Sequence, residues 1–569
     1  MKRILTVLAL SVLLIVKINA QKHDYIWLTG YSSNDTDSTF GGSIIDFNVM
    51  PPDITYQFRE MNLDACNVSM CDDEGNLLFY FNGIWIANSN HEQMVNGNNL
   101  GPDAYNQSWS GSGLPLVQGA ISLPRPNSNN QYILVHEELK QGGLMGNIAS
   151  IDNCFYSIID MDLNGGLGEV TDKNIIIVND TLDFGKLVAT KHGNGRDWWV
   201  IIPEFSNNKY YKALITPNGI EQVNNQTIGD TSISGLGQAV FSLDGNKYAR
   251  YGVHSTLEPS YIDIFDFDRC NGEFSNPYRI VIDTADVGFI NGFTGLIFSP
   301  NGNILYHLNR DAIVQYDMTV TDIIASKDTV ATYDGFIAPG PFPFETSFFL
   351  GQTGPDEKIY ISTSAVTEYM HIIHNPNILG EGCNVEQHGL ELPTYNNRSM
   401  PNFPNYRLYA EVGSSCDTLR PIAQFTHLPD MLNVAFTDES QRTPTEWFWT
   451  FGEGGSSTEQ NPQYVYNTSG MYEVCLMVTN EAGSDTICQM VEIILDGVDE
   501  LEFSESIVIS PNPTSGLLRI KLPERRIEDW EITFYDALGR ILLRKYLRKN
   551  TDEENVLLHD FPSGVFSIK

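Results

Sequence analysis

Short aromatic or aliphatic stretches recur along most of the chain, and each follows a turn rich in Gly, Asn or Asp. The stretches are DDEGNLLFYF (72–81), NSNNQYILV (127–135), GNGRDWWVI (193–201), SLDGNKYAR (242–250), SPNGNILYHL (299–308) and GPDEKIYIS (354–362). Short runs rich in aromatic and aliphatic residues and bounded by turn residues are typical of β-strands, and the turn residues are typical of hairpins. The pattern therefore predicts an all-β fold of small antiparallel sheets.

The recurrence has a nearly constant spacing. The turns at 195, 245, 302 and 357 are 50, 57 and 55 positions apart. A second strand recurs between them, as FYSIIDMDL (155–163), YIDIFDFDR (261–269) and AIVQYDMTV (312–320). A period of about 50 residues with several strands is typical of β-propeller blades. With the opening strand YIWLTGY (25–31), the six turns predict a seven-bladed (six to eight) β-propeller over residues 22–411, in which GGSIIDFN (41–48) completes the ring with strands from the end of the region.

The first twenty residues have the layout of a secretory signal peptide. Lys2 and Arg3 are basic, residues 4–16 are almost all apolar, and small Ala20 precedes Gln21. An apolar run of this length is too short to cross a bilayer, which takes about 20 residues in a helix. The sequence predicts cleavage between Ala20 and Gln21 and export of a chain without a transmembrane segment.

Export places the eight cysteines where disulfides can form. Cys475 and Cys488 lie in YEVCLMVTNEAGSDTICQMVEI, which has the pattern of two strands around a short turn. Facing residues of such a hairpin share one number sum, here 963, so Thr479 faces Ser484 and the two sulfurs are neighbours. Proximity along the chain gives the remaining candidate pairs: Cys66 with Cys71, Cys383 with Cys416, and by remainder Cys154 with Cys270.

The charge balance limits the class of partner. There are 34 Lys and Arg against 71 Asp and Glu, a formal net charge of −37. That balance argues against binding to nucleic acid, whose backbone needs a positive surface, and against docking on an anionic membrane. Only 18% of the residues are charged and 42% are hydrophobic, so the chain is not a disordered acidic tail and has material for several cores.

The region over residues 22–411 resembles a recurrent propeller family of secreted bacterial proteins. The matching stretches, in order, are CDDEGNLLFYFNGIWIANSNHEQM, KHGNGRDWWVII, GQAVFSLDGNKYARY, FDFDRCNGEFSN, FSPNGNILY and SMPNFPNYRL. The resemblance implies a secreted or surface protein. It brings no catalytic residue with it.

Residues 420–496 change pattern and resemble a PKD domain. The stretch 449–454 (WTFGEG), followed by Asn461-Pro462, Tyr466 and GMY at 470–472, carries the resemblance, which implies an immunoglobulin-like β-sandwich. Trp447 and Trp449 are two positions apart and so lie on one face of a strand. Trp449 is expected in the core, and Trp447 is a weak candidate for stacking on a sugar.

Residues 507–569 resemble the type A C-terminal sorting domain of the type IX secretion system, a second small β-sandwich of immunoglobulin-like fold. IVISPNPTSGLLRIKLPE, ITFYDALGRILLRKYL and LLHDFPSGVFSIK carry the resemblance. It implies recognition by the type IX machinery and a location outside a Gram-negative cell, either secreted or on the outer surface. The family usually continues past the last of these stretches into a basic strand, which leaves open whether this C-terminus supports export.

No catalytic residue, cofactor or metal site is predicted. The sequence has no GxSxG, HExxH, P-loop or GxGxxG after a strand. His136 begins HEE, which lacks the second His of a zincin motif, and His371 and His374 are spaced for opposite faces of a strand. No CxxC supports a zinc site at the cysteines. Trp198 and Trp199 follow a turn that also holds His192 and Asp197, and the two tryptophans are weak candidates for ligand binding.

These features together predict a binding and adhesion protein at the cell surface, whose propeller and PKD domain bind protein or glycan. The alternative is a surface hydrolase or lyase that acts on polysaccharide in the propeller channel, because blades can bring carboxylates together from distant parts of a sequence. Three or more Asp, Glu or His side chains converging there would favour the enzyme, and an apolar or aromatic-lined mouth would favour binding.

Overall fold

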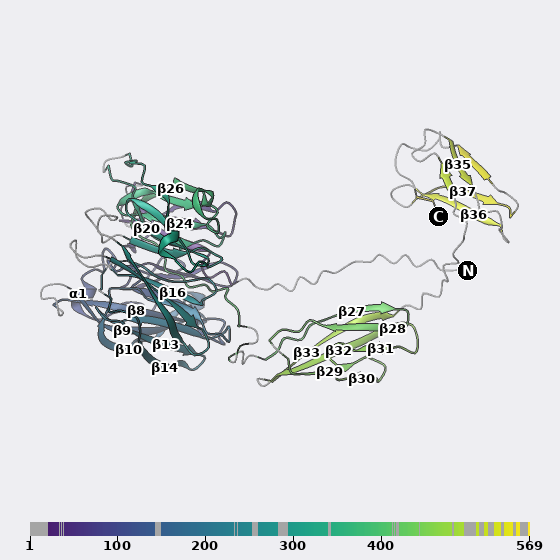
Figure 1. Ribbon diagram of the computed structural model, residues 1–569, viewed down its shortest axis with the longest axis horizontal. Coiled ribbons are helices and arrows are strands. Elements are labelled where there is room, and N and C mark those ends of the chain that lie inside the picture. The colour runs from purple at the N-terminus through teal and green to yellow at the C-terminus, as the bar shows by residue number, and fades with distance from the viewer. Residues whose placement is uncertain are drawn as a thin grey trace. The chain divides into compact units, whose positions relative to one another are not determined.

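The structure is a computed structural model of the chain, and it describes most of residues 21–493 and the strands of residues 508–568. The residues outside the description are 1–20, 33–34, 36, 38, 143–148, 233, 236, 253–259, 283–293, 340–342, 412–413, 415, 417–419, 443, 481–482, 494–507, 511–516, 522–528, 536–539, 550–552, 558–566 and 569. The predicted leader, with Ala20, therefore lies outside the described residues. The chain divides into two compact units, one mainly of the residues up to Ala423 and the other mainly of the residues from Gln424 onwards, and each is described by itself (Figure 1).

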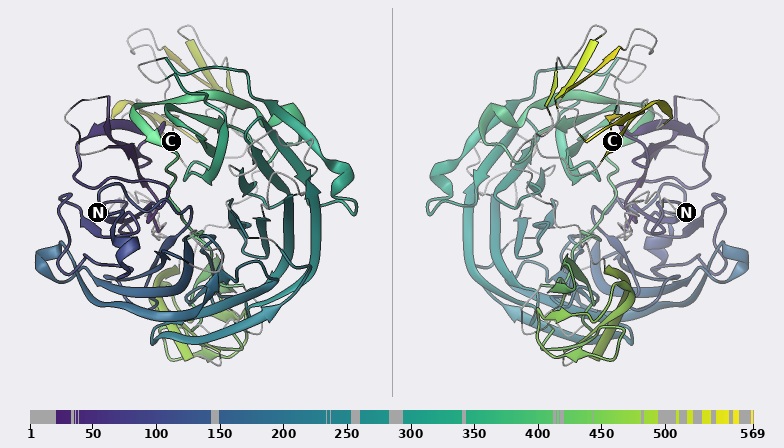
Figure 2. Two further views of the ribbon diagram at one scale, coloured as in Figure 1. Left: turned by 90° about the vertical axis from the view of Figure 1, so that its left-hand side faces the viewer. Right: turned by 90° about the vertical axis from the view of Figure 1, so that its right-hand side faces the viewer.

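The first unit consists of small antiparallel sheets arranged around a common centre (Figure 2). Its described residues form seven sheets, two of three strands and five of four. Sheet by sheet, the strands are β1 (Ile26–Tyr31), β2 (Gly41–Asp46), β3 (Asp53–Gln57); β4 (Val68–Cys71), β5 (Leu77–Phe81), β6 (Ile86–Asn88); β7 (Ala120–Pro124), β8 (Gln131–Lys140), β9 (Ser150–Asp160), β10 (Glu169–Leu182); β11 (Val188–Lys191), β12 (Trp198–Pro203), β13 (Lys209–Thr216), β14 (Gly219–Thr227); β15 (Ala239–Phe241), β16 (Lys247–Gly252), β17 (Ser260–Asp268), β18 (Glu273–Ile282); β19 (Thr294–Phe298), β20 (Ile304–Asn309), β21 (Ala312–Asp317), β22 (Asp328–Thr332); β23 (Phe348–Thr353), β24 (Ile359–Thr363), β25 (Val366–Ile373), β26 (Val385–Asn397).

Helix occurs only as short segments among the described residues. They are α1 (Ala104–Gln107) and the 3-10 turns Asn164–Gly166, Ile324–Ser326 and Gly380–Cys383. None of the described helices has the length and apolar character needed to span a membrane.

The turns that recur in the sequence occupy one position in the fold. Six of them precede the second strand of six successive sheets, namely β5, β8, β12, β16, β20 and β24. In four turns a glycine with φ between +70° and +90° donates its N–H to the carbonyl three residues earlier; these are Gly75, Gly195, Gly245 and Gly302. Glycine adopts this left-handed backbone without steric cost. Asp or Asn side chains such as Asp244 and Asn301 accept N–H groups of the same turn, so they serve the hairpin itself.

The circle of sheets closes where the last strand meets the first sheet. The Oγ atoms of Ser43 in β2 and Thr394 in β26 are 2.9 Å apart, and the N–H of Tyr395 donates to the carbonyl of Thr39. Asn397 donates to Asp64, ahead of the second sheet, at 3.0 Å. The start and the end of the region are thus joined by side-chain and main-chain hydrogen bonds.

Beyond β26 the chain turns inward as residues 399–411, which we call the strap. The amide nitrogen of Asn402 donates to the carbonyls of Ala120 and Leu187, each at 2.9 Å, while Asn405 donates to Leu243 at 2.7 Å. These carbonyls belong to the third, fourth and fifth sheets, or to the residues that lead into them. One segment therefore binds three neighbouring sheets.

The strap also lies along β1. The rings of Phe403 and Trp27 are 6.1 Å apart, and Arg407 forms a two-pronged ion pair with Asp24 at 2.6 and 2.8 Å. The amide of Asn67 donates both to the carbonyl of Leu28 and to the hydroxyl of Ser399. The strap thereby fills the inner side of the three-stranded first sheet.

The second unit contains two further groups of sheets, each a pair. The first pair is β27 (Phe425–Asp430), β28 (Asn433–Asp438), β31 (Gln463–Val465) against β30 (Ser456–Ser457), β29 (Glu446–Thr450), β32 (Gly470–Asn480), β33 (Gly483–Ile493). Trp449 lies in the core of this pair, fully buried, with Phe425 5.1 Å away, as expected from the sequence. The second pair is β34 (Val508–Ser510), β35 (Leu517–Lys521), β38 (Glu553–Leu557) with β37 (Ile541–Leu547), β36 (Trp530–Tyr535), β39 (Ser567–Ile568).

Replacement of Asn402 by Ala is expected to destabilise the first unit by about 2–4 kcal/mol, because two buried carbonyls lose their donor and each unsatisfied buried group costs roughly 1–3 kcal/mol. Asn225→Ala, at an exposed position of β14, is the matched control and should change stability by less than about 0.5 kcal/mol. Urea unfolding followed by tryptophan fluorescence measures both. Equal effects of the two substitutions would contradict the role given to the strap.

Candidate functional site

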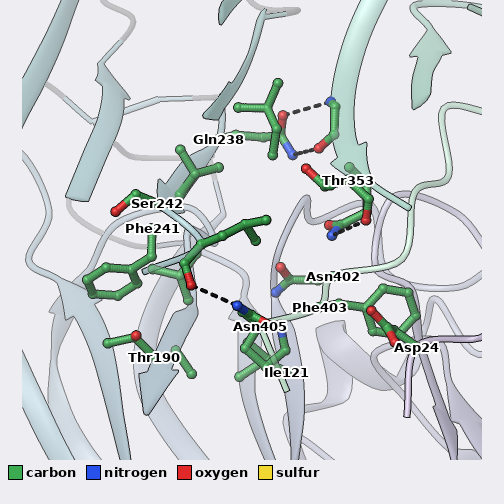
Figure 3. A pocket seen from close by; sticks show the side chains of 18 of the residues that line it. Asp24, Ile121, Thr190, Gln238, Phe241, Ser242, Thr353, Asn402, Phe403 and Asn405 are labelled. Carbon is green, nitrogen blue, oxygen red and sulfur yellow. Dashed lines mark hydrogen bonds between the residues drawn. The ribbon is translucent and has the colours of Figure 1, made fainter. Parts of the chain in front are cut away.

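The centre of the first unit contains a cavity of about 350 Å³ (Figure 3). Its walls come from the first strands of five sheets, β7, β11, β15, β19 and β23, from the turn after β23, and from the strap. The lining residues that the following argument uses are Asp24, Gln118, Thr190, Gln238, Phe241, Gln352, Thr353, Glu357, Asn402, Phe403, Asn405 and Arg407. The volume lies within the range of about 300–1,000 Å³ that is typical of ligand sites.

Three amide side chains close one side of the cavity. Gln118 exchanges two hydrogen bonds of 2.9 Å with the main chain of Ala239, and it also donates to the side-chain oxygen of Asn402. Gln238 exchanges two hydrogen bonds of 3.0 and 3.1 Å with the main chain of Gly351. Amides suit this position because each offers both a donor and an acceptor to the unpaired edges of the inner strands.

The uncharged part of the remaining lining is mixed in polarity. Thr353 is 8% exposed, and its hydroxyl oxygen has no hydrogen-bond partner among the described residues. Thr190 adds a second hydroxyl, and the rings of Phe241 and Phe403 add apolar surface. A cavity with aromatic walls and a buried free hydroxyl has the composition of a site for a small neutral molecule.

Two carboxylates line the cavity, and one of them is paired with an arginine side chain. Asp24 is 3% exposed and both its oxygens accept from Arg407. Burial alone would lower the pKa of Arg407, but the hydrogen bonds and the charge of Asp24 raise it above its usual value. Glu357 is the other carboxylate, and the described lining residues include no His. General acid–base catalysis of glycosidic cleavage needs two free carboxyl groups facing one bond, and this lining does not supply them.

The HEE stretch lies away from the cavity and is structural. His136 is fully buried between the rings of Phe81 and Phe155, and burial lowers its pKa to about 3. Burial also raises the pKa of the Glu137 carboxyl well above its usual value, and Asp183 acts in the same direction. Glu137 accepts the N–H of Gly185 at 3.1 Å. These side chains hold two sheets together and face no open space.

His371 and His374, the other two histidines considered from the sequence, do not lie together in a site. His371 is buried and bonded to the carbonyl of Thr346 at 2.7 Å, whereas His374 is paired with Glu386 on the surface. No group of three His, Cys, Asp or Glu side chains in the described part of the chain is arranged to hold a metal ion.

The tryptophans named as ligand candidates have different positions. Trp198 is 1% exposed and Trp199 is 2% exposed, and their ring N–H groups donate to the carbonyls of Pro124 and Arg269. Neither has a ring face left for a ligand, because two adjacent bulky residues on a central strand serve the cores on both of its sides. Trp447 is half-buried, and its N–H donates to Asp438 at 2.7 Å, so only part of its ring is available.

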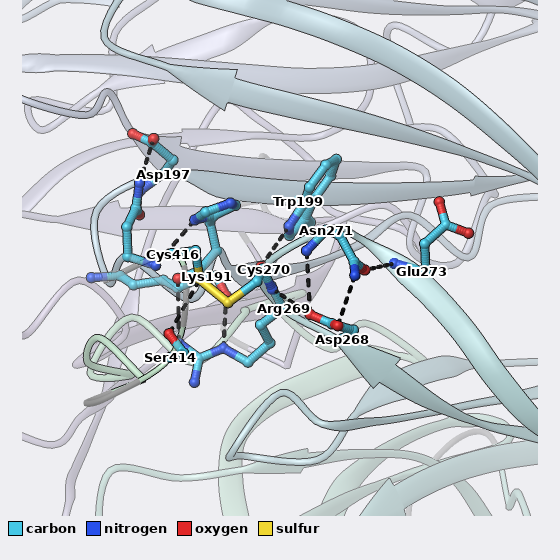
Figure 4. Close-up of a disulfide and its surroundings, with 12 residues drawn as sticks. Lys191, Asp197, Trp199, Asp268, Arg269, Cys270, Asn271, Glu273, Ser414 and Cys416 are labelled. Carbon is cyan, nitrogen blue, oxygen red and sulfur yellow. Dashed lines mark hydrogen bonds between the residues drawn. A yellow bond between two sulfur atoms is a disulfide. The ribbon is translucent and has the colours of Figure 1, made fainter. Parts of the chain in front are cut away.

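The structure contains two disulfides among the described cysteines. Cys475 and Cys488 are joined across the hairpin of β32 and β33, and the hydroxyls of Thr479 and Ser484 lie 2.8 Å apart, in the register that the sequence indicates. Cys416 is joined to Cys270 (Figure 4).

The two disulfides predicted from proximity along the chain, Cys66–Cys71 and Cys383–Cys416, are therefore wrong. The pair left over, Cys154–Cys270, is wrong as well. Cys383 is a buried free thiol, because the strap carries Cys416 away from the seventh sheet to the fifth. Cys66 and Cys71 are also buried free thiols on the second sheet, where each packs into a different core. Burial raises the pKa of all three thiols. Cys154 is free as well.

The disulfide of Cys270 and Cys416 lies where the strap leaves the sheets. Arg269 donates to the carbonyls of Lys191 and Tyr409, at 2.9 and 2.7 Å, and so ties the fourth sheet to the strap. Gly193 passes directly under the two sulfurs, where a Cβ atom would overlap with Cys416. The bridge thus secures a junction that hydrogen bonds already define (Figure 4).

Sequence reasoning missed the residues that close the cavity. Gln118, Gln238 and Asn402 belong to no catalytic or binding motif, although Gln238 lies in the stretch GQAVFSLDGNKYARY and Asn402 lies in SMPNFPNYRL. The partners of the two glutamines are 121 and 113 positions away, so no local pattern marks them.

Comparison with known families identifies two parts of the chain. Residues 425–495 match the PKD domain, and residues 508–569 match the secretion system C-terminal sorting domain. The chain is therefore a secreted or cell-surface multidomain protein of the Bacteroidetes whose C-terminal domain is addressed to the type IX machinery.

Individual relatives and solved structures cover different shares of the chain. Collagenase ColQ1 of Bacillus cereus (strain Q1) is 37% identical over 51 residues, which is 9% of this chain and 5% of the collagenase. The PKD1 domain of the Vibrio cholerae metalloprotease PrtV is 33% identical over 13% of this chain and 98% of its own, with a TM-score of 0.13. A functionally unknown protein of Desulfotomaculum acetoxidans is 14% identical over 67% of this chain and 90% of its own, with a TM-score of 0.27. None of these similarities supports an inference about a ligand of the cavity.

The two disulfides are expected to differ in their effect on stability. They close loops of 146 and 13 residues, and the chain-entropy relation gives about 5 kcal/mol for the long loop and about 3 kcal/mol for the short one. Replacing Cys270 and Cys416 by Ser should thus destabilise the first unit more than replacing Cys475 and Cys488 destabilises the second. Denaturant unfolding of each double variant, with the other disulfide intact, measures the difference. The reverse order would show that the long bridge does not constrain the strap.

Proposed function

We propose that residues 22–411 form a seven-bladed β-propeller behind a leader over residues 1–20, with a PKD sandwich over 420–496 and the sorting domain over 507–569. The seven sheets of the first unit, the repeated turn before their second strands and the closure through β26 and the strap support this organisation. Each sheet would be one blade, and the strap would complete the first.

In this proposal the protein is a non-enzymatic binding and adhesion protein at the cell surface, whose propeller binds a glycan and whose PKD domain is a spacer or an accessory binder. The observation that carries the proposal is the central cavity, with its aromatic and hydroxyl lining. Among the described lining residues Glu357 is the one unpaired carboxylate, which argues against a polysaccharide hydrolase that works with two carboxyl groups.

The ligand that fits this lining is a neutral polar group with an apolar face, such as the terminal sugar of a glycan. Hydroxyl groups of a sugar would pair with Thr353 and Thr190, and a face of its ring would contact Phe241 or Phe403. An anionic ligand would leave its charge uncompensated, since Arg407 is already neutralised by Asp24.

A glycan screen with residues 21–500 is expected to find a neutral oligosaccharide that binds, and Thr353→Val is expected to weaken its affinity about tenfold, since a lost hydrogen bond is worth roughly 1–1.5 kcal/mol. Thr227→Val, at an exposed position of β14, is the matched control and should leave the affinity unchanged. Isothermal titration measures both. Undiminished binding by the Thr353 variant would exclude the cavity as the site, and hydrolysis of the oligosaccharide by the wild type would favour the enzyme.

A further inference from the structure

One of the six repeated turns carries a glutamate where four of the others carry glycine. In the turn before β24, Glu357 has φ +62° and donates its N–H to the carbonyl of Gly354 at 2.9 Å. Gly245 and Gly302 hold the same place before β16 and β20, with φ of +74° and +71° and the same hydrogen bond to the third residue back. Asp356, like the residue before each of these glycines, accepts an N–H group of its own turn. The backbone at position 357 is therefore one that favours glycine.

The turn itself does not compensate for a glutamate at this position. A left-handed backbone brings the Cβ atom of any residue other than glycine close to the following carbonyl oxygen, which costs free energy. The side chain of Glu357 has no hydrogen-bond or ion-pair partner among the described residues. The other charges of the turn are matched, since Lys358 Nζ lies 3.2 Å from Oδ2 of Asp356, which also accepts from Tyr360 at 3.0 Å. A strained residue that pairs with nothing in its own turn is a candidate for contact with a ligand.

The side chain of Glu357 belongs to the lining of the central cavity. Glu357 is exposed to solvent, whereas Thr353, which ends β23 ahead of the same turn, is 8% exposed and has a free hydroxyl (Figure 3). One turn thus supplies a buried hydroxyl inside the cavity and a carboxylate in contact with solvent. The two groups are held by the same short stretch of backbone, so their relative position is set by the turn.

We propose that Glu357 is the specificity-determining residue of the cavity and accepts two hydroxyls on adjacent carbons of a sugar ring. The inference rests on the proposed function and names the class of sugar, which is a neutral terminal sugar with a free vicinal diol. An ionised carboxylate offers only acceptors, with its two oxygens side by side, so the ligand has to bring two neighbouring donors. Adjacent ring hydroxyls supply these donors without adding charge.

The exposure of Glu357 decides between a diol and a cationic group as its partner. An ion pair at a solvent-exposed carboxylate contributes little, because water screens the charges. Two hydrogen bonds to an ionised acceptor are stronger than those between neutral groups, and together they fix the orientation of the ligand. Among the described lining residues Arg407 is the one cation, and it is paired with Asp24. A diol on Glu357 leaves Thr353 for a further hydroxyl of the ligand.

The proposal gives the substitution Glu357→Gly two opposite effects. Glycine is expected to raise the folding equilibrium constant of the first unit about threefold, because the relief of strain exceeds the cost of its greater freedom in the unfolded chain. It is expected to weaken the affinity for the ligand about tenfold, because both acceptors are lost. Glu357→Gln keeps one acceptor and should weaken the affinity about fivefold. Glu74→Gln, at an exposed glutamate in the turn before β5, removes the same charge and should change neither quantity.

Affinity and stability are measured on the full mature chain and its variants. Saturation-transfer NMR titrations use neutral disaccharides that end in mannose, glucose or galactose, and urea unfolding gives the stability. A derivative of the bound disaccharide that lacks one hydroxyl of the diol should bind the wild type about tenfold more weakly. Glu357→Gly should bind this derivative and the parent disaccharide equally, because the group that reads the hydroxyl is gone.

The outcomes separate the inference from the proposed function. If the wild type binds none of the disaccharides, both are overturned. Binding that Thr353→Val weakens and Glu357→Gly leaves unchanged keeps the cavity as the glycan site and overturns the role of Glu357. Tighter binding of a derivative with an amine in place of one hydroxyl, lost in Glu357→Gly, overturns the diol as the recognised group. A lower stability of Glu357→Gly than of the wild type would show that the turn itself requires the glutamate, and this result also overturns the inference.

Discussion

The hydrogen bonding of the strap to the inner strands is the interaction on which the first unit depends. Five sheets turn the unpaired edge of their first strand towards the centre, and buried main-chain groups that lack partners are costly. Asn402 supplies donors to two of these edges, and Gln118 and Gln238 supply donors and acceptors to others. The strap brings one of these amides from the far end of the region. The sheets can therefore come together only around a polar, hydrogen-bonded centre. The same hydrogen bonds determine the shape of the cavity that remains there.

The chemistry of the cavity is a consequence of this closure. Neutral amides can pair with strand edges of any register without adding charge to a region from which water is excluded, whereas buried charges need partners. The ion pair at the rim, Asp24 with Arg407, obeys the same rule, because each charge is matched. What is left for a ligand is hydroxyl, amide and aromatic surface. Matched charges and paired amides thus stabilise the centre by the same physical rule.

The sequence predicts local features well and distant ones poorly, for a physical reason. Strands and turns follow from alternation and from residues such as Gly245 and Gly302, whose conformations depend on their own neighbours. The Cys475–Cys488 pair follows from hairpin register for the same reason. Cys416, by contrast, meets Cys270 across 146 positions because of the path of the strap, which no local pattern encodes. The cavity residues share this property: Gln118 and Gln238 are defined by strand edges more than 100 positions away.

The position of the disulfide determines how a pulling force from the C-terminal side would reach the strap. A protein held at a surface through its C-terminal region receives any pulling force along the chain that leaves residue 416. Without the bridge, this force would act first on Asn405 and Arg407 and would peel the strap from the sheets one hydrogen bond at a time. The bond from Cys416 to Cys270 instead transfers the force to the connection between β17 and β18, which holds Cys270. Arg269 adds a second link at the same point, to the strap at Tyr409 and to the fourth sheet at Lys191. The hydrogen bonds of the strap and the cavity that it lines are thus shielded from tension at the point where the chain leaves the first unit.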